Sequence, residues 1–328
     1  MEQNSLYQVT SSPHLRSNFS VTRIMGDVLI GLLPATALAV YFFGLDALLI
    51  VLVCIISAMA AEAIVQVIRK QPIRIKDLSA AVTGLLLALN LPATAPLWMA
   101  ALGSIFAIVV VKQLFGGLGQ NFMNPALGGR VFLVISYPLL MGQYIAPINR
   151  IGDIGADAMT YTTDALTYST PLAMMKSGAF DNLPSFIDGF LGNVGGSLGE
   201  TSALALLIGG LYLMIRKVIS WEIPVIYIGT TFLLSFLLYD FNLNVAASSI
   251  VFGGVMLGAF FMATDYASSP ITQKGRMIYA LLLGILTVLI RRFGGYPEGV
   301  MFAIIIMNAF TPAIESFTRS KVFGGSKK

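Results

Sequence analysis

The sequence from Thr162 to Gly178, TTDALTYSTPLAMMKSG, places an acid and a row of hydroxyls in a chain that is otherwise 56% hydrophobic. A residue that precedes proline is kept out of the helical region, so a short helix is predicted to begin at Pro171 with Ser169 or Thr170 as its N-cap. The first turn of a helix has free N–H groups and the positive end of the helix dipole, which favour a phosphate group. The Thr170 hydroxyl is therefore a candidate to carry a phosphoester.

Helix capping alone explains only part of this segment. It accounts for Thr170 and Pro171, but it does not explain why Asp164, Thr167 and Ser169 precede them. Nor does it explain why such a helix lies in the longest polar region of the chain.

Further polar residues adjoin the apolar segments. Arg130 follows NPALGG at the start of one of them, where an arginine is a functional candidate by default, although its side chain can also extend to the interface. Asn124 and Pro125 predict a break whose freed backbone groups need protein or ligand partners. Thr264 and Asp265 follow a later apolar run, where they form a second candidate site or simply cap a helix.

Composition identifies the class of protein and excludes several kinds of chemistry. Only 11% of the residues are charged, against about 25% in soluble domains, which indicates an all-α polytopic membrane protein. The chain has one cysteine, Cys54, and one histidine, His14, whereas an iron–sulfur cluster needs about four thiolates. We therefore expect no metal site, and any electron transfer needs an organic cofactor or clusters on partner subunits.

Ten apolar runs are long enough to span or half-span a bilayer, for which a full span takes about 20 residues. The third is short and ends in NLPATAP, which predicts a broken or re-entrant helix. The runs are Ile24–Phe43, Leu45–Ile68, Leu78–Leu91, Pro96–Phe115, Ala126–Ala146, Glu200–Ile219, Ile223–Tyr239, Leu243–Ala263, Arg276–Phe293 and Glu298–Phe317.

Basic residues between the runs fall on one side of the membrane if the ten segments alternate, which predicts that both termini are cytoplasmic. The predicted organisation is a cytoplasmic segment (1–22), five helices (23–146), an extracytoplasmic loop (147–199), five more helices (200–318) and a basic cytoplasmic tail (319–328). In this topology Arg130 lies near the cytoplasmic end and far from Thr170, so it would serve a second ligand or subunit packing.

The two halves resemble each other. KQLFGGLGQNFMNPALGGR (Lys112–Arg130) has an echo in RRFGGYPEGVMFAIIIMNAFTPAIE (Arg291–Glu315), because each contains a basic residue, an aromatic, Gly-Gly and Met-Asn before a proline. An odd number of helices per half requires the second copy to be inverted. Inverted repeats with broken helices place a binding site near the membrane midplane, between the halves.

The stretch DALTYSTP resembles the flavinylation motif of membrane redox subunits, with Ser169 where alanine is common. With SSPHLRSNFSVTRIMGDVLIGLLPA, LFGGLGQNFMNPALGGRVF and FFMATDYASSP, it makes nearly the whole chain similar to the NqrB/RnfD family, and the short N-terminus and Tyr266 favour the RnfD branch. The resemblance implies that a flavin transferase esterifies FMN onto Thr170, with Asp164 part of its recognition motif. It also implies a second, non-covalent flavin such as riboflavin, near Thr264 and Asp265, with Asn124 and Arg130 as further cofactor-binding candidates.

The resemblance further implies an electron-relaying subunit of the bacterial inner membrane, in a complex that couples ferredoxin oxidation and NAD⁺ reduction to Na⁺ or H⁺ export. Its partners would be RnfA, RnfB, RnfC, RnfE and RnfG, with no nucleic acid and no complete catalytic site on this chain. Two alternatives stay open: an NqrB-type subunit that feeds quinone, which neighbouring subunits would distinguish, and a urea-transporter-like channel, which would purify without colour because it needs no flavin.

Overall fold

The computed structural model describes residues 20–145, 147, 169–178, 180 and 183–319. In these residues the chain is helical, with one isolated bridge between Pro92 and Ser197 in place of a sheet. The elements before the polar region are α1 (Val21–Phe43), α2 (Leu45–Ile68), η1 (Ile75–Asp77), α3 (Ser79–Leu89), α4 (Leu97–Phe106), η2 (Ala107–Gln113), α5 (Pro125–Ser136) and α6 (Pro138–Met141). Then come α7 (Pro171–Ser177), α8 (Phe186–Leu191), α9 (Ala203–Ile215), α10 (Glu222–Leu238), α11 (Leu243–Val251), α12 (Val255–Leu257), η4 (Gly258–Met262), α13 (Gln273–Phe293) and α14 (Val300–Thr318).

Three of the described helices, α1, α2 and α14, are long and apolar enough to cross a membrane, and α11 with α12 and η4 makes a fourth candidate that is bent by 59°. Five shorter apolar helical segments in the same part of the chain have 10–17 residues, and α13 has 21. Each predicted run has its helix or helix pair, so the prediction of an all-α membrane protein is confirmed. The expected break after the third run is also present, because α3 ends at Leu89 and the chain turns before α4.

The eighth run is predicted as one continuous segment over Leu243–Ala263. This prediction is wrong in the middle of the run. The helix stops at Val251, and Gly253 takes a φ of +77° that side chains rarely adopt. Pro138 likewise separates α5 from α6, so the fifth run is not one long helix. Both breaks shorten helices that a hydropathy pattern treats as continuous.

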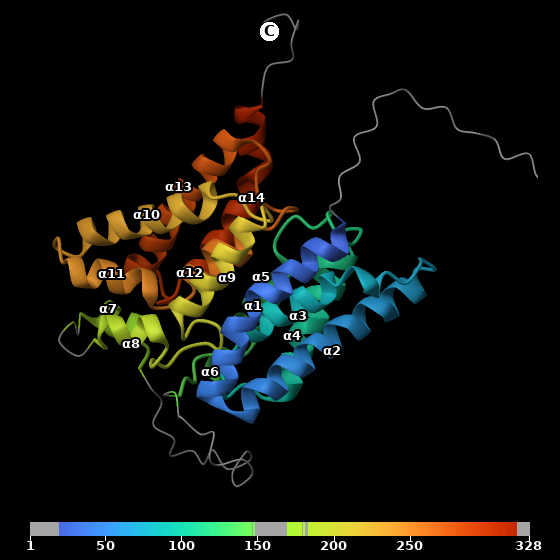
Figure 1. The fold of residues 1–328 in the computed structure, drawn as a ribbon, viewed down its shortest axis with the longest axis horizontal. Helices are drawn as coiled ribbons and strands as arrows, with labels where there is room; N and C mark the ends of the chain where they lie inside the picture. Colours follow the sequence, from blue (N-terminus) through green and yellow to red (C-terminus); the bar gives the residue numbers. More distant parts are fainter. Residues whose placement is uncertain (1–19, 146, 148–168, 179, 181–182, 320–328) are drawn as a thin grey trace, which may run out of the picture.

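The two halves of the chain use similar packing partners. In the first half α2 packs on α3 and α4, and in the second α10 packs on α11 and α13. Where the two halves meet, which we call the seam, α1 packs on α9, and α5 packs on α14. Figure 1 shows the first half, in blue to green, beside the second, in yellow to red. This arrangement agrees with the predicted repeat, while its inversion and the domain boundaries stay predictions.

Two glycines set the closeness of the seam. A Cβ on Gly209 of α9 would lie 1.9 Å from the Gly31 carbonyl oxygen of α1. Small residues of this kind let membrane helices approach backbone to backbone. The two halves therefore meet in direct backbone contact at this point.

The predicted outer loop does not stay outside along its whole length. Its last residues return to the interior, where Ser197 and Leu198 are fully buried. The Leu198 and Gly199 N–H groups donate to the carbonyl oxygens of Leu91 and Leu89, at 3.0 and 2.7 Å. This happens because the chain break after α3 leaves carbonyl groups that need donors away from water.

Candidate functional site

The helix predicted at Pro171 is present as α7. Its N-cap is Thr170, whose Oγ1 accepts a hydrogen bond from the Ala173 N–H at 3.3 Å. Gly178 ends the helix with a φ of +78°. In Figure 1, α7 lies with α6 and α8 at the end of the molecule opposite to the last turn of α14.

Helix α7 is fixed to the second half of the chain through one face, because Leu172, Met175 and Lys176 are spaced i, i+3 and i+4. Leu172 and Met175 are buried in a small apolar cluster that includes Phe252. From the last turn, Lys176 Nζ donates to the carbonyl oxygens of Gly294 and Gly295, at 2.5 and 2.8 Å. These contacts place the half-buried Thr170 side chain against the loop that joins α13 to α14.

Thr170 and Ser169 line a cavity of about 400 Å³. This volume lies within the range of small-molecule sites. We call this space the Thr170 cavity. The rest of its wall comes from both halves: Arg130, Val134, Pro138, Met141, Gly142, Tyr144, Ala173, Tyr296, Pro297, Glu298 and Met301.

Arg130 does not lie where the sequence predicted it. Its side chain is 2% exposed, so it does not extend to the interface, and it lines the Thr170 cavity. The prediction that it is remote from Thr170 is wrong because α5 is a short, interior helix that begins at a break. At Arg130 the chain is thus already inside the protein, where the sequence predicts that it enters the membrane.

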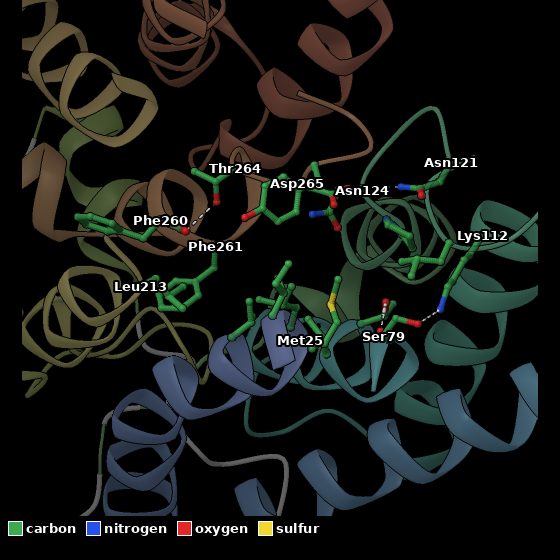
Figure 2. Close-up of a pocket in the computed structure, with 18 residues that line it drawn as sticks. Met25, Ser79, Lys112, Asn121, Asn124, Leu213, Phe260, Phe261, Thr264 and Asp265 are labelled. Atoms are coloured by element: carbon green, nitrogen blue, oxygen red, sulfur yellow. Dashed lines mark hydrogen bonds between the residues drawn. The ribbon is translucent and has the colours of Figure 1, made fainter. Parts of the chain in front are cut away.

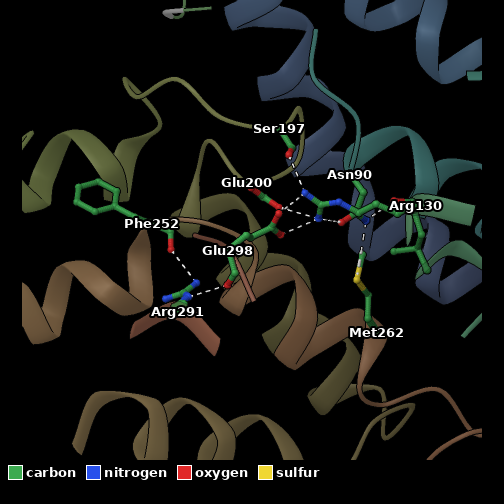
Figure 3. A network of polar contacts seen from close by, with 9 residues as sticks. Asn90, Arg130, Ser197, Glu200, Phe252, Met262, Arg291 and Glu298 are labelled. Atoms are coloured by element: carbon green, nitrogen blue, oxygen red, sulfur yellow. Dashed lines mark hydrogen bonds and ion pairs between the residues drawn. The ribbon is translucent and has the colours of Figure 1, made fainter. Parts of the chain in front are cut away.

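Arg130 joins the halves through a polar network that is drawn in Figure 3. One terminal nitrogen donates to Asn90 Oδ1 at 2.5 Å, to Glu200 Oε1 at 3.0 Å and to Glu298 Oε1 at 2.7 Å. The other donates to Ser197 Oγ at 3.2 Å and to the second oxygen of Glu298. Its Nε is buried without a hydrogen-bond partner in the described part of the chain.

The two acids of this network were not among the predicted site residues. Glu200 and Glu298 stand at the starts of predicted apolar runs, where a carboxylate is expected to be an interfacial residue. In the structure their side chains are 6% and 13% exposed. The signal that could have found Glu298 is GYPEG, because it belongs to the repeat whose first copy contains Arg130; Glu200 lies outside both copies.

Gly254, in the break between α11 and α12, makes room for both acids. A Cβ there would lie 2.9 Å from Glu298 Oε1 and 3.0 Å from Glu200 Oε1. Nearby, the Arg291 guanidinium donates to the backbone carbonyls of Ser249, Phe252 and Glu298, at 2.6, 3.3 and 2.8 Å. The broken helix is thus stabilised by one arginine, while its glycine accommodates two carboxylates.

Three more of the predicted residues lie on the wall of a second cavity, of about 80 Å³ (Figure 2). Asn124, Thr264 and Asp265 all line it, with Lys112 and the aromatic residue Phe260. Residues far apart in the sequence therefore meet here, as the repeat predicted. Lys112 also forms a buried ion pair with Glu62, 2.9 Å away, outside the predicted set.

Many polar groups on the wall of this second cavity already form hydrogen bonds within the protein. Asn124 Oδ1 accepts from the N–H groups at the start of α5, and its amide donates to the Met262 carbonyl at 3.3 Å. The Thr264 hydroxyl donates to the Phe260 carbonyl at 2.8 Å, and Asp265 accepts from the Ser268 hydroxyl at 3.0 Å. Asn124 is thus the N-cap of α5, whereas Thr264 and Asp265, for which helix capping is the alternative role, cap none of the described helices.

Two further sequence predictions concern the residues upstream of Thr170 and the expectation of no metal site. Asp164 and Thr167 lie outside the described residues. Among the residues that are described, no group of three or more His, Cys, Asp or Glu side chains could hold a metal ion.

Comparison with known proteins gives similarities over almost the whole chain. A family model described as the NQR2, RnfD, RnfE family matches residues 8–324. The D subunit of the Na(+)-translocating ferredoxin:NAD(+) oxidoreductase complex of Acetobacterium woodii is 51% identical over 324 residues, which cover 97% of this chain and 96% of that protein. The proton-translocating counterpart of Clostridium ljungdahlii is 41% identical, covering 98% and 97%. The D subunit of the ion-translocating oxidoreductase complex of Citrobacter koseri is 38% identical, covering 97% and 99%.

Proposed function

Because this chain belongs to the NQR2, RnfD, RnfE family, we propose that it is the D subunit of an ion-translocating ferredoxin:NAD⁺ oxidoreductase complex and relays electrons within it. The similar proteins carry that name, and the similarity extends over nearly their whole length. Its partners would be the other subunits, RnfA, RnfB, RnfC, RnfE and RnfG. The names of the relatives include both Na⁺ and proton translocation, so the ion stays open between the two.

The cofactor we propose is FMN, joined to Thr170 through a phosphoester. The observation that carries this proposal is that the half-buried Thr170 hydroxyl borders a cavity of about 400 Å³. The residues around it suit a flavin, because Tyr144 and Tyr296 offer aromatic surface and Arg130 offers a cation. A bound flavin would supply one- and two-electron transfer, while the protein would orient it and tune its electrostatics.

Each wall residue would have a separate task. The Thr170 oxygen would hold the phosphorus, and Ser169 beside it would contribute a second hydroxyl at the cavity wall. Arg130 would lie beside the phosphate or the reduced flavin as a hydrogen-bond donor, while its own charge is already matched by Glu200 and Glu298. The seam between the halves would exclude water, which strengthens electrostatic interactions inside it.

Maturation would require a flavin transferase. The Thr170 hydroxyl would lose its proton and attack the flavin-side phosphorus of FAD, so that a P–O bond forms to the threonine as the P–O bond within the pyrophosphate breaks and AMP leaves. Asp164, six residues upstream, would help the transferase recognise this peptide. We place this step outside the cytoplasmic membrane, with both chain termini in the cytoplasm of a bacterial cell.

A second, non-covalent flavin such as riboflavin would bind beside Asn124, Thr264 and Asp265 only if their 80 Å³ cavity opened further, because small-molecule sites measure about 300–1,000 Å³. Support comes from the aromatic side chains of Phe260 and Phe261 beside these polar groups. Two flavins in one chain would give electrons successive sites within the membrane.

The test of the covalent flavin is a denaturing gel viewed under ultraviolet light, after co-expression with the transferase. We expect a fluorescent band at this subunit that is lost in Thr170→Ala. Ser177→Ala, which removes an exposed hydroxyl at the other end of α7, should keep it. A fluorescent Thr170→Ala chain would refute attachment at Thr170 and direct attention to Thr167 and Ser169.

The side of the membrane is tested by cysteine labelling in a Cys54→Ala background. Ile187 of α8 is 65% exposed, and Ile73, between α2 and η1, is 58% exposed. Ile187→Cys should react with a membrane-impermeant thiol reagent in intact cells, whereas Ile73→Cys should react only after lysis. The reverse pattern would invert the proposed topology.

A further inference from the structure

Arg130, Glu200 and Glu298, which we call the Arg130 cluster, bring two carboxylates to one guanidinium. Oε1 of Glu200 and Oε1 of Glu298 lie 3.0 and 2.7 Å from the same terminal nitrogen of Arg130. The same two oxygens are those that a Cβ on Gly254 would meet at 3.0 and 2.9 Å. Two negative charges therefore converge on one point between the halves, where a single positive charge is in direct contact with both.

The other charged and titratable groups around this pair are few. Arg291 of α13 is buried nearby, but its guanidinium donates to three backbone carbonyls. Tyr144 and Tyr296 line the Thr170 cavity with Glu298, and Tyr144 also borders Glu200 in a smaller cavity beside it. With both carboxylates ionised, the two arginines and the two acids sum to zero charge, and the proposed phosphodiester on Thr170 would add one fixed negative charge beside them.

An electron that reaches a flavin in the Thr170 cavity would disturb this balance. It would add one negative charge beside a neutral cluster, in an interior where uncompensated charge is costly. The arginines cannot respond, because a guanidinium is always protonated and only donates hydrogen bonds. A carboxylate can respond, since it accepts a proton and then becomes neutral.

We propose that the Glu200–Glu298 pair takes up one proton when the flavin on Thr170 gains one electron. This inference rests on the proposed function. The electron comes from the redox chain of the complex, and the proton comes from water and forms an O–H bond on a carboxylate oxygen. The flavin changes by one negative charge and the pair by one positive charge, so the sum is unchanged.

Glu298 is the acid to which the structure assigns the proton. It lines both the Thr170 cavity and the smaller one beside it, whereas Glu200 lines only the smaller one, which Thr170 also borders. Its side chain is also the more accessible of the two, at 13% against 6%. Glu200, held behind it, keeps its charge and stabilises Arg130.

The experiment is a redox titration of the covalent flavin in the purified, flavin-loaded chain at several pH values. The signal of this flavin is isolated by subtracting the spectrum of a matched Thr170→Ala chain. In the wild type, the midpoint potential of the one-electron step should become more negative by about 59 mV per pH unit, the value of a tenfold change for one electron. In Glu298→Gln the dependence should be lost.

Glu222→Gln is the matched control. Glu222 is likewise a buried carboxylate paired with an arginine, Arg276, 3.7 Å away, but it does not line the Thr170 cavity. It should retain the wild-type dependence on pH. Equal slopes in wild type, Glu298→Gln and Glu200→Gln would overturn the inference, as would a potential that follows Na⁺ concentration instead of pH.

A second measurement uses only the wild-type chain, so it does not depend on whether a variant folds. Infrared difference spectra of the wild-type chain, reduced minus oxidised, should gain the carbonyl stretch of a protonated carboxylic acid. Its absence would overturn the inference even if Glu298→Gln fails to accumulate. The denaturing gel separates the two proposals: a wild-type chain without covalent flavin refutes the proposed function, whereas a fluorescent chain with an unchanged slope refutes only this inference.

Discussion

The seam between the two halves predicts a large effect for the smallest possible substitution. In Gly209→Ala the added Cβ would lie 1.9 Å from the Gly31 carbonyl oxygen and 3.1 Å from a ring carbon of Phe261. Neither neighbour can yield easily, because one is backbone and the other is a buried ring. Helices α1 and α9 would have to separate by roughly 1 Å, and such overpacking costs about 1–3 kcal/mol.

The control for this substitution is Gly229→Ala in α10. Nothing lies within 4 Å of a Cβ at Gly229, so alanine there should stabilise the helix by up to about 1 kcal/mol. We therefore expect the free energies of unfolding of the two variants to differ by about 2–4 kcal/mol, with Gly209→Ala the less stable.

Thermal unfolding in detergent measures this difference. For a chain of this size, each kcal/mol should shift the midpoint by about 2–4 °C. If unfolding is irreversible, the half-life at a fixed temperature replaces the midpoint. Equal stability of Gly209→Ala and Gly229→Ala would refute the close backbone contact between α1 and α9.

Three further predictions test the elements around the two cavities. Lys176→Met should loosen α7, because two carbonyl groups at the end of α13 lose their donor, and limited proteolysis should cut the 169–178 region faster than in the wild type. Asn124→Ala should lower the midpoint of thermal unfolding through a loss of about 1 kcal/mol for the missing N-cap of α5, and an unchanged midpoint would show that the cap is dispensable. Asp164→Asn should reduce in-gel flavin fluorescence while stability stays within about 0.5 kcal/mol; intact fluorescence would remove Asp164 from the recognition motif.

Several features could be predicted from the sequence because they depend on neighbours along the chain. Hydropathy and the scarcity of charge are enough to predict membrane helices. The Thr170–Pro171 step and Gly178 predict where α7 begins and ends, since capping depends on local backbone angles. The break at Asn124 could be predicted for the same reason. Gly253 and Gly254 also favour a break in the helix. They lie within an apolar run, however, and the hydropathy of that run predicts one continuous segment.

The contents of the candidate site depend instead on contacts between distant parts of the chain. Arg130 meets Glu200 and Glu298, which are 70 and 168 positions away, and no local pattern selects these two acids as its partners. The partners are selected by burial, because a charge enclosed between the halves must be paired. The sequence by itself determined a membrane helix bundle and a capped threonine. Only the packing of one half on the other decided that this threonine shares a cavity with a buried arginine and its two carboxylates.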